Sequence, residues 1–106
     1  MDYRLVLTTC ADQATADKLA KALVEKRLAA CVSCLPGVRS FYEWKGKLES
    51  EQEQLLLIKS REDKYSELEQ TLRKLHPYEL PEIIAVPIEE GLVPYLNWID
   101  TQLDNR

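Results

Sequence analysis

Residues 31–59 read CVSCLPGVRSFYEWKGKLESEQEQLLLIK, and this segment decides the fold. Cys31 to Trp44 is rich in small and β-branched residues and carries Pro36-Gly37 near its middle, which favours a bent strand over a helix. Trp44-Lys45-Gly46-Lys47 forms a turn, and Leu48 to Lys59 returns as a second strand. At about 3.3 Å per residue the first strand spans roughly 46 Å, against about 17–20 Å for an average strand. The sequence therefore predicts a β-hairpin too long for one small domain to cover.

The returning strand divides into a polar half and an apolar half. Glu49 to Gln54 are all polar, so we assign them to the part of the hairpin that projects. Leu55 to Ile58 are consecutive hydrophobic residues, a pattern typical of a strand that is buried on both faces. We therefore expect the base of the hairpin to supply two central strands of a sheet, while its tip extends beyond that sheet.

A short strand and an amphipathic helix precede the hairpin. Tyr3 to Thr9 is rich in residues that favour strands, and Asp12 follows as an N-cap whose side chain can accept from free amides of the next turn. Apolar residues then recur at three- and four-residue spacing, with charged residues between them, up to about Arg27. The pattern predicts a helix with one buried face.

A second helix and a fourth strand follow the hairpin. Ser60 with Asp63 three residues later is a variant of the capping box, so we expect a helix to begin at Ser60. It should end near Leu75, because a residue that precedes proline avoids the α region. Glu82 to Ile88 is strongly apolar, and Pro87 within it indicates an edge strand. Beyond this strand, a last helix with hydrophobic residues on two faces is expected.

The predicted order is strand, helix, strand, strand, helix, strand and a final helix. This is the α+β ferredoxin-like βαββαβ sandwich plus a C-terminal helix, as a single domain over residues 1–106 with two helices on one face of a four-stranded antiparallel sheet. The outer strands are about half as long as the hairpin and would leave bare edges. We therefore predict an oligomer in which the hairpin continues the sheet into a neighbouring subunit and buries Phe41, Tyr42 and Trp44.

Composition excludes several classes of function. The net charge of −4 offers no basic surface to nucleic acid, and no apolar run approaches the ~20 residues that span a bilayer. The residues after Met1 lack the features of a signal peptide, so we expect a cytoplasmic protein with reduced thiols. Cys31-x-x-Cys34 lies in an extended run, without the helix N-terminus that activates a redox pair. Phosphate-loop, nucleophile-elbow and HxxxH motifs are absent, so we expect no enzymatic activity.

Five blocks of sequence, in order along the chain, carry a resemblance to a known family. They are RLAACV at 27–32, PGV at 36–38, YEWKGKLE at 42–49, HPYELPEII at 76–84 and YLNWI at 95–99. Together they resemble the CutA divalent-cation-tolerance family over essentially the whole chain. The resemblance implies a ferredoxin-like protomer in a PII-like homotrimer with clefts between subunits. It also implies a non-enzymatic role in tolerance to divalent metals, including copper binding.

Three residues are candidate ligands for a metal ion. His76, the only histidine, could bind a soft metal, anchor a cleft, or simply act as a cation at a helix C-terminus. The resemblance favours the ligand, because copper-ligand proposals in the family include the matching histidine. Leu75 and Thr8 stand where the family's copper binders have a second histidine and a cysteine, but Cys10 lies on the same side of a continuing strand as Thr8 and could supply the thiol. Cys31 is either a small buried hydrophobe or a thiolate ligand for copper.

The resemblance also implies a ligand cleft near the end of the second helix. Its expected residues are Tyr78, Glu79, Glu82, Trp44, Lys45 and Glu49. The aromatic residues of the hairpin tip could form a shelf for a ligand or the core of an interface. Glu49, Glu51 and Glu53 alternate and so share one face of a strand, as a hard-cation site or as a solvated stripe. In the second case nearby cations of the hairpin partly neutralise the stripe, namely Lys45, Lys47 and Arg39.

Two functions follow as hypotheses. The first is a cytoplasmic homotrimer that binds copper or other divalent ions weakly in metal homeostasis. The second is a PII-like signalling or scaffold module that binds a small ligand in the cleft between subunits. A third possibility is that the assembly itself is a structural product and that the effects on metal tolerance are indirect.

Overall fold

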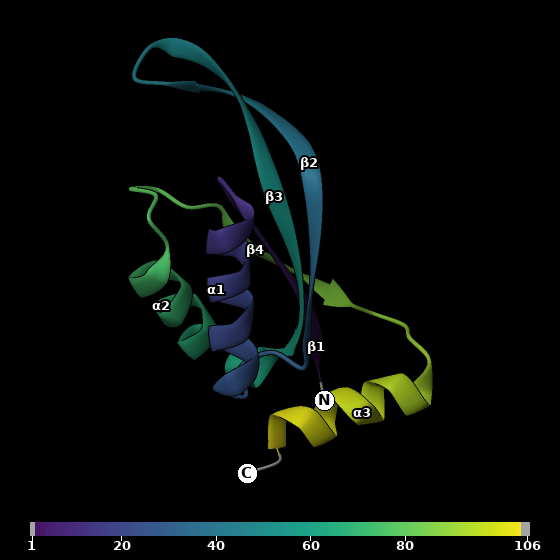
Figure 1. The fold of residues 1–106 in the computed structure, drawn as a ribbon. Coiled ribbons are helices and arrows are strands. Elements are labelled where there is room, and N and C mark those ends of the chain that lie inside the picture. The colour runs from purple at the N-terminus through teal and green to yellow at the C-terminus, as the bar shows by residue number, and fades with distance from the viewer. Residues whose placement is uncertain (1, 105–106) are drawn as a thin grey trace.

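The computed structural model describes residues 2–104, and its elements follow the predicted order (Figure 1). They are β1 (Tyr3–Cys10), α1 (Gln13–Glu25), β2 (Cys31–Trp44), β3 (Lys47–Arg61), the short 3-10 helix η1 (Glu62–Lys64), α2 (Tyr65–Leu75), β4 (Ile83–Ile88) and α3 (Val93–Asp104). The expected α+β fold is confirmed. No helix among the described residues is long and apolar enough to cross a membrane.

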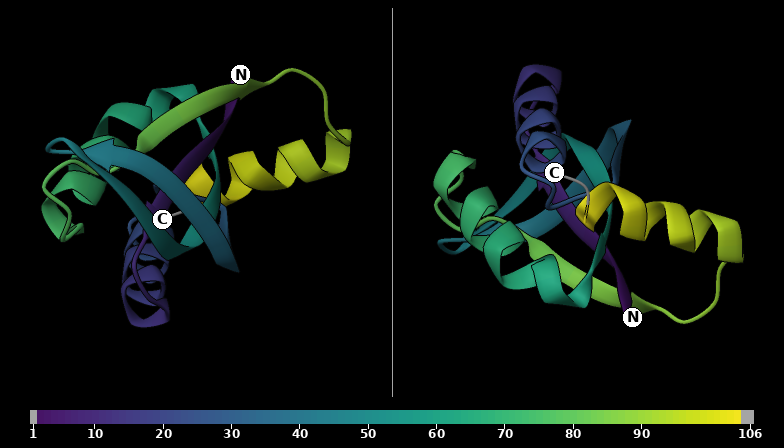
Figure 2. Two further views of the ribbon diagram at one scale, coloured as in Figure 1. Left: turned by 90° about the horizontal axis from the view of Figure 1, so that it is seen from above. Right: turned by 90° about the horizontal axis from the view of Figure 1, so that it is seen from below.

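The strands form one four-stranded sheet in the order β2–β3–β1–β4, and every neighbouring pair is antiparallel. Helices α1 and α2 lie side by side on one face, whereas α3 lies apart from them near the base of the sheet (Figures 1 and 2). Strand β4 is an edge strand, as Pro87 predicted. The expectation of two central strands in the hairpin is wrong for β2, because β2 pairs with β3 alone and forms the other edge.

The hairpin has the predicted length and bend. Strands β2 and β3 pair from Cys31 and Lys59 at the base to Trp44 and Lys47 at the tip, with an irregularity between Leu35 and Val38. Lys45 and Gly46 both have positive φ, 53° and 80°, as a tight turn of the I′ kind requires. Strand β1 pairs with β3 only as far as Gln54, so residues 47–53 have a partner on one side only. We call residues 38–53 the arm, and it curls over at the top of Figure 1.

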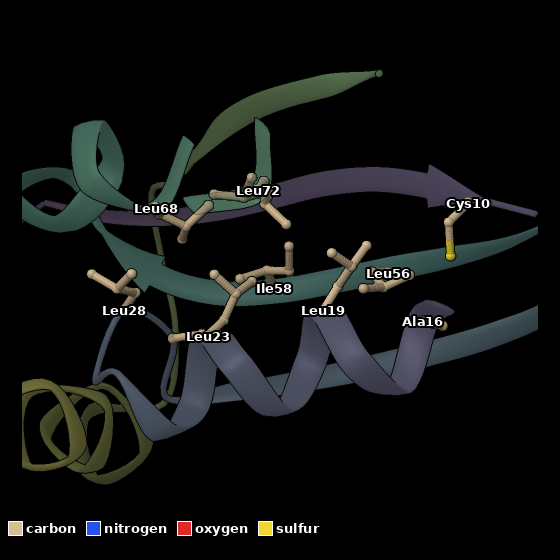
Figure 3. Packing of buried hydrophobic residues seen from close by; sticks show 11 residues of the cluster. Cys10, Ala16, Leu19, Leu23, Leu28, Leu56, Ile58, Leu68 and Leu72 are labelled. Atoms are coloured by element: carbon tan, nitrogen blue, oxygen red, sulfur yellow. The ribbon is translucent and has the colours of Figure 1, made fainter. Parts of the chain in front are cut away.

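The main core lies between the sheet and the helices α1 and α2 (Figure 3). It contains Cys10, Ala16, Leu19, Leu23, Leu28, Leu56, Ile58, Leu68 and Leu72, all nearly or fully buried. Helix α1 begins where the sequence predicts, because Asp12 accepts a hydrogen bond from the Thr15 amide at 2.8 Å. It ends at Glu25, slightly before the predicted Arg27.

The predicted start of the second helix at Ser60 is wrong. Strand β3 continues to Arg61, because β1 still pairs with it there, and η1 separates it from α2. The Ser60 hydroxyl is fully buried and donates to the carbonyl of Leu28 at 2.7 Å, so it caps no helix. Asp63 likewise makes no capping box, since both of its carboxylate oxygens accept from the Arg61 guanidinium.

The sheet face opposite α1 and α2 is apolar and largely uncovered. The register places Leu57, Leu7 and Ile84 in one cross-strand row on this face. Seven hydrophobic residues share it, namely Leu5, Leu7, Leu35, Leu55, Leu57, Ile84 and Val86. Ile84 and Val86 are 49% and 42% exposed, and α3 packs near the base of the sheet through a small second cluster that includes Ala30, Ile99 and Leu103.

Candidate functional site: an acidic cleft between the arm and the loop before β4

A cleft of about 860 Å³ lies between the arm and the loop that joins α2 to β4. The end of β1 closes it on a third side through Thr9 and Ala11. Four of the lining residues are aromatic, namely Phe41, Tyr42, Trp44 and Tyr78. Five are acidic, namely Glu43, Glu51, Glu53, Glu79 and Glu82. No lysine or arginine is among the lining residues that the structure describes, so the cleft has a strongly negative character.

The arm brings its acidic and aromatic side chains to this cleft through its register. Tyr42 lies opposite Glu49, and Ser40 lies opposite Glu51. Since directly opposed residues of a β-ladder point to the same face, the alternating glutamates share a face with Tyr42, as their spacing predicted. Glu53 departs from the expected solvated stripe, because it is only 5% exposed.

Glu53 is held by a residue of the facing loop. The Tyr78 hydroxyl donates to Oε2 of Glu53 at 2.7 Å, which joins the arm to the loop across the cleft. Burial, and then this hydrogen bond, raises the pKa of Tyr78 well above its ordinary value, so that the phenol keeps its proton and remains a donor. Glu53 Oε1 has no protein donor among the described residues.

His76 supports the loop behind this contact. Its ring is buried, with Nε2 2.7 Å from the carbonyl oxygen of Thr9, and Nδ1 accepts the backbone N–H of Tyr78 at 3.1 Å. Because the amide of Tyr78 can only donate, Nδ1 is the acceptor and the proton lies on Nε2. Both ring nitrogens are therefore occupied by backbone groups, and the ring packs 4.7 Å from that of Tyr78. In this arrangement His76 joins the end of β1 to the Tyr78 loop, and a metal ion would have to displace one of these two partners.

The cysteines do not join His76 in one cluster. Cys10 is fully buried on the helix face of the sheet, its Sγ 3.6 Å from the carbonyl oxygen of Asp12, and burial raises the pKa of its thiol. Cys31 lies in the row of Lys59 and Leu5, on the other face and at the base of the hairpin. Within residues 2–104, no three His, Cys, Asp or Glu side chains are grouped so that they could hold a metal ion.

The predicted cleft residues are brought together only in part. Trp44, Tyr78, Glu79 and Glu82 line the cleft. Lys45 does not line it, and its Nζ lies 5.8 Å from the centre of the Trp44 ring. Glu49 also lies outside the lining, two residues nearer the tip than Glu51.

The sequence did not place Glu51 or Glu53 in the cleft, and Tyr42 was expected only as part of an aromatic shelf or an interface core. The available signal was the alternation of the glutamates opposite Tyr42, which marks one polar face of the arm. The curl of the arm toward the Tyr78 loop could not be predicted from the sequence. The expected neutralisation by basic residues is not seen either, because no described ion pair joins an arm glutamate to a cation and Arg39 instead lies over the Phe41 ring at 5.4 Å.

The negative charge of the cleft affects the pKa of Tyr42. Burial, followed by the charges of Glu51, Glu53 and Glu49, raises the pKa of its phenol. A negative phenolate is therefore disfavoured at this position. A positive charge placed beside Tyr42 would be favoured by the same three carboxylates.

Comparisons with known proteins identify the family. A CutA1 divalent ion tolerance protein family model matches residues 4–102. A divalent-cation tolerance protein CutA of Thermus thermophilus is 46% identical and covers 90% of this chain and 92% of its own length. A protein CutA homolog of Xenopus laevis is 50% identical over 86% of this chain, which spans only 60% of that longer protein. The crystal structure of CutA from Xylella fastidiosa is 46% identical, covers 98% of this chain and 100% of its own, and superposes with a TM-score of 0.95. The chain belongs to the CutA1 divalent ion tolerance protein family.

Proposed function

We propose that this protein contributes to divalent-cation tolerance by binding copper or other divalent ions weakly, without catalysing a reaction. The observation that supports the proposal is a cleft lined by five carboxylates in a chain whose family is named for tolerance of divalent ions. The CutA family is non-catalytic, in agreement with the expectation from the sequence. We also propose that the protein acts in the cytoplasm.

The donor atoms support weak binding rather than a tight metal centre. Carboxylate oxygens suit hard cations such as Mg²⁺, which keep several waters and need only one or two protein carboxylates. The cleft offers such oxygens, but no three donors converge on one point among the described residues. A tetrahedral zinc centre, which needs three or four convergent N or S ligands, does not fit this arrangement.

For copper, the proposed ligands are His76 and Cys10, with Cys31 as a separate thiol on the other sheet face. The residues do not form a ready-made copper site, because the His76 nitrogens are both hydrogen-bonded and Cys10 is buried as a thiol. Binding would require loss of the contact to Thr9 or Tyr78 and removal of a proton from Cys10. We therefore expect low affinity that increases with pH.

Calorimetric titration with Cu(I), Cu(II) and Zn(II) tests these ligands. His76→Ala, Cys10→Ala and Cys31→Ser should each be compared with wild type, after circular dichroism has shown that the variant is folded. Cys34→Ser is a matched control, since Cys34 is an exposed thiol outside the proposed set. Loss of copper binding in His76→Ala supports the site. Copper binding that survives all three substitutions would exclude it.

We also propose that the protein is a homotrimer. The apolar sheet face that contains Leu7, Ile84 and Val86 supports an interface, because exposed apolar patches of this kind mark contact surfaces. The unpaired edges of the arm are a second indication, since their backbone groups can pair with another subunit. A PII-like assembly would satisfy both features.

Light scattering after size exclusion tests the assembly. Ile84→Glu buries a charge in the proposed interface and should reduce the mass to that of a monomer, as should replacement of residues 42–50 by a short turn. Val24→Glu on α1 is the matched control, because Val24 is an exposed hydrophobe on the helical side. An unchanged mass in both variants would contradict the proposed interface, and a wild-type mass other than three chains would contradict the trimer.

A PII-like module that binds a small organic ligand is the second candidate function. The specific observation in its favour is the volume of the cleft, which lies within the range of about 300–1,000 Å³ of ordinary ligand sites, and its aromatic lining. Titration with nucleotides and small organic acids separates this function from the first. Saturable binding of an organic ligand that is unaffected by His76→Ala would favour the second candidate.

A further inference from the structure

We infer that the arm is a hinged element whose orientation is fixed, before subunits assemble, by the hydrogen bond between Tyr78 and Glu53. The closed arm, in which this bond is made, is the form that pairs with a neighbouring subunit. The inference rests on the homotrimer proposed above and names the contact that controls its formation. Three features carry it: a break in the sheet at the base of the arm, the scarcity of contacts along the arm, and the support behind Tyr78.

Two discontinuities of the sheet coincide at the base of the arm. On one side of β3, the pairing with β1 ends at Gln54. On the other side, and at the same level of β3, the register with β2 is irregular between Leu35 and Val38. Gly37 within this irregular step has a φ of 79°, and a Cβ atom there would have no neighbour within 4 Å. A two-stranded ribbon that continues from the sheet through such a step can bend there with little loss of packing, as a hinge requires.

Beyond this step the arm has few contacts with the rest of the protomer. All of its residues are described, none of them belongs to either hydrophobic cluster, and Glu53 alone among them is buried. Within residues 2–104, the bond from Tyr78 to Glu53 is the one hydrogen bond that joins the arm to a segment outside the hairpin. A two-stranded hairpin is marginally stable by itself, and segments with few buried apolar contacts open at low cost. The orientation of the arm therefore depends on this bond.

Tyr78, in contrast, has firm support. Its backbone N–H donates to Nδ1 of His76 at 3.1 Å, and Nε2 of the same ring lies 2.7 Å from the carbonyl oxygen of Thr9 in β1. The rings of His76 and Tyr78 pack with their centroids 4.7 Å apart. The Tyr78 hydroxyl, 2.7 Å from Glu53 Oε2, thus comes from a side chain that is anchored to the sheet. The bond therefore holds a weakly supported arm against a fixed loop.

The consequence for assembly follows from the fraction of chains whose arm is closed. Loss of one hydrogen bond to a charged group shifts the equilibrium between the closed and the open arm by roughly tenfold or more. Only closed chains can pair, so the apparent rate of association decreases with the closed fraction. When two chains meet, both arms must be closed, and the decrease in rate is the square of the decrease in that fraction.

Refolding of the full chain by dilution from urea tests the inference. Circular dichroism follows the folding of the chain, and light scattering follows the concentration-dependent assembly after it. Tyr78→Phe removes the hydroxyl and keeps the ring. We expect the closed fraction to fall about two- to tenfold, and the assembly rate therefore to fall about four- to hundredfold.

Pulsed hydrogen exchange, applied at low protein concentration before assembly, examines the arm directly. Peptides from residues 38–53 should label faster in Tyr78→Phe than in wild type, by up to about tenfold. Peptides from residues 55–61, which β1 also pairs with, should label at the same rate in both proteins.

Tyr65→Phe is the matched control. The Tyr65 hydroxyl donates to Oε1 of Glu69 at 2.8 Å within α2, so this variant loses the same kind of bond at a distance from the arm. It should leave the assembly rate unchanged. Glu53→Gln keeps an acceptor for the Tyr78 hydroxyl and should slow assembly less than Tyr78→Phe does. In the Tyr78→Phe background Glu53→Gln should have no further effect, as a double-mutant cycle on a single contact requires.

Several results would overturn the inference. Equal slowing by Tyr78→Phe and Tyr65→Phe would mean general destabilisation of the fold. Equal labelling of the arm in Tyr78→Phe and wild type would mean that Tyr78 does not hold it. A trimer that assembles at the wild-type rate in Tyr78→Phe would refute the inference but preserve the homotrimer. A wild-type chain that stays monomeric would refute the homotrimer and the role in assembly, and the labelling would still decide separately whether Tyr78 holds the arm.

Discussion

Replacement of Arg61 by methionine is expected to loosen helix α3. The guanidinium is only 3% exposed and makes four hydrogen bonds, two to Asp63, one to Asp100 and one to Asp104, at 2.6–3.0 Å. Asp100 and Asp104 belong to α3, and Asp100 also accepts from the Tyr3 hydroxyl at 2.7 Å. Arg61 therefore joins the end of β3 to the last helix, and the apolar stem of methionine preserves most of its packing.

The expected loss is about 2–4 kcal/mol in the free energy of unfolding. Four hydrogen bonds to charged groups would be worth about 6–12 kcal/mol if each counted fully. The three carboxylates are 31–63% exposed, however, so they regain hydration when the cation is removed. The buried arginine also carries a desolvation penalty that methionine does not. These two effects offset most of the hydrogen-bond energy. The net loss of about 2–4 kcal/mol corresponds to a fall in Tm of roughly 10–20 °C.

Urea unfolding at a fixed protein concentration, followed by circular dichroism, measures this difference. Its pH dependence provides a second test, because the Arg61 guanidinium lowers the pKa of Asp63 and Asp104 below the ordinary value of 3.8. A carboxyl whose pKa is lower in the folded state stabilises that state above the unfolded pKa. This contribution is lost as the pH falls through the folded pKa. The difference between wild type and Arg61→Met should therefore be constant near neutral pH and shrink below about pH 4.

The control is Arg73→Met on the exposed side of α2, which should change the stability by less than about 0.5 kcal/mol. Trp98 in α3 provides a local probe, because its fluorescence should change before global unfolding if the helix detaches. A stability of Arg61→Met within about 1 kcal/mol of wild type at pH 7 would contradict the role of Arg61 in joining β3 to α3. A difference that persists unchanged at acidic pH would contradict it as well.

Three further substitutions test individual contacts by the urea midpoint. Tyr78→Phe should destabilise by about 1.5–3 kcal/mol, because Glu53 loses its only protein donor, and a neutral result would contradict the contact between arm and loop. Asp12→Ala should cost about 1 kcal/mol through loss of the bond to the Thr15 amide, while Asp12→Asn retains a capping oxygen and should cost less. Thr8→Val should be neutral or stabilising, since the buried Thr8 hydroxyl has no partner among the described residues; a loss above about 1 kcal/mol would reveal one.

Local sequence signals predicted those features that depend on a few neighbouring residues. Asp12 caps α1 because its side chain reaches the amide of Thr15, three residues away. Gly46 marks the hairpin turn because glycine readily adopts the positive φ required there, and Pro87 marks an edge strand because it has no N–H to donate to a further strand. The alternating acidic run and the apolar run after it predicted the second strand of the hairpin, because side chains alternate between the two faces of a strand. The order of elements, and hence the fold class, could be predicted from these signals.

Contacts between distant segments decided the rest. Ser60 belongs to β3 rather than to a helix because β1 pairs with the strand there and Leu28 supplies an acceptor. Glu53 is buried because Tyr78, 25 residues later, lies across the cleft from it.

The elements, their order, the exceptional length of the hairpin and the alternation of acids along it could all be predicted from the amino-acid sequence, since each depends on local backbone preferences and periodicity. Three features became visible only in the folded chain: β2 is an edge strand, both nitrogens of His76 are occupied, and the arm curls over the loop to form an acidic cleft. Burial, hydrogen-bond partners and charge at these positions are set by residues far away in the chain, so no local pattern encodes them.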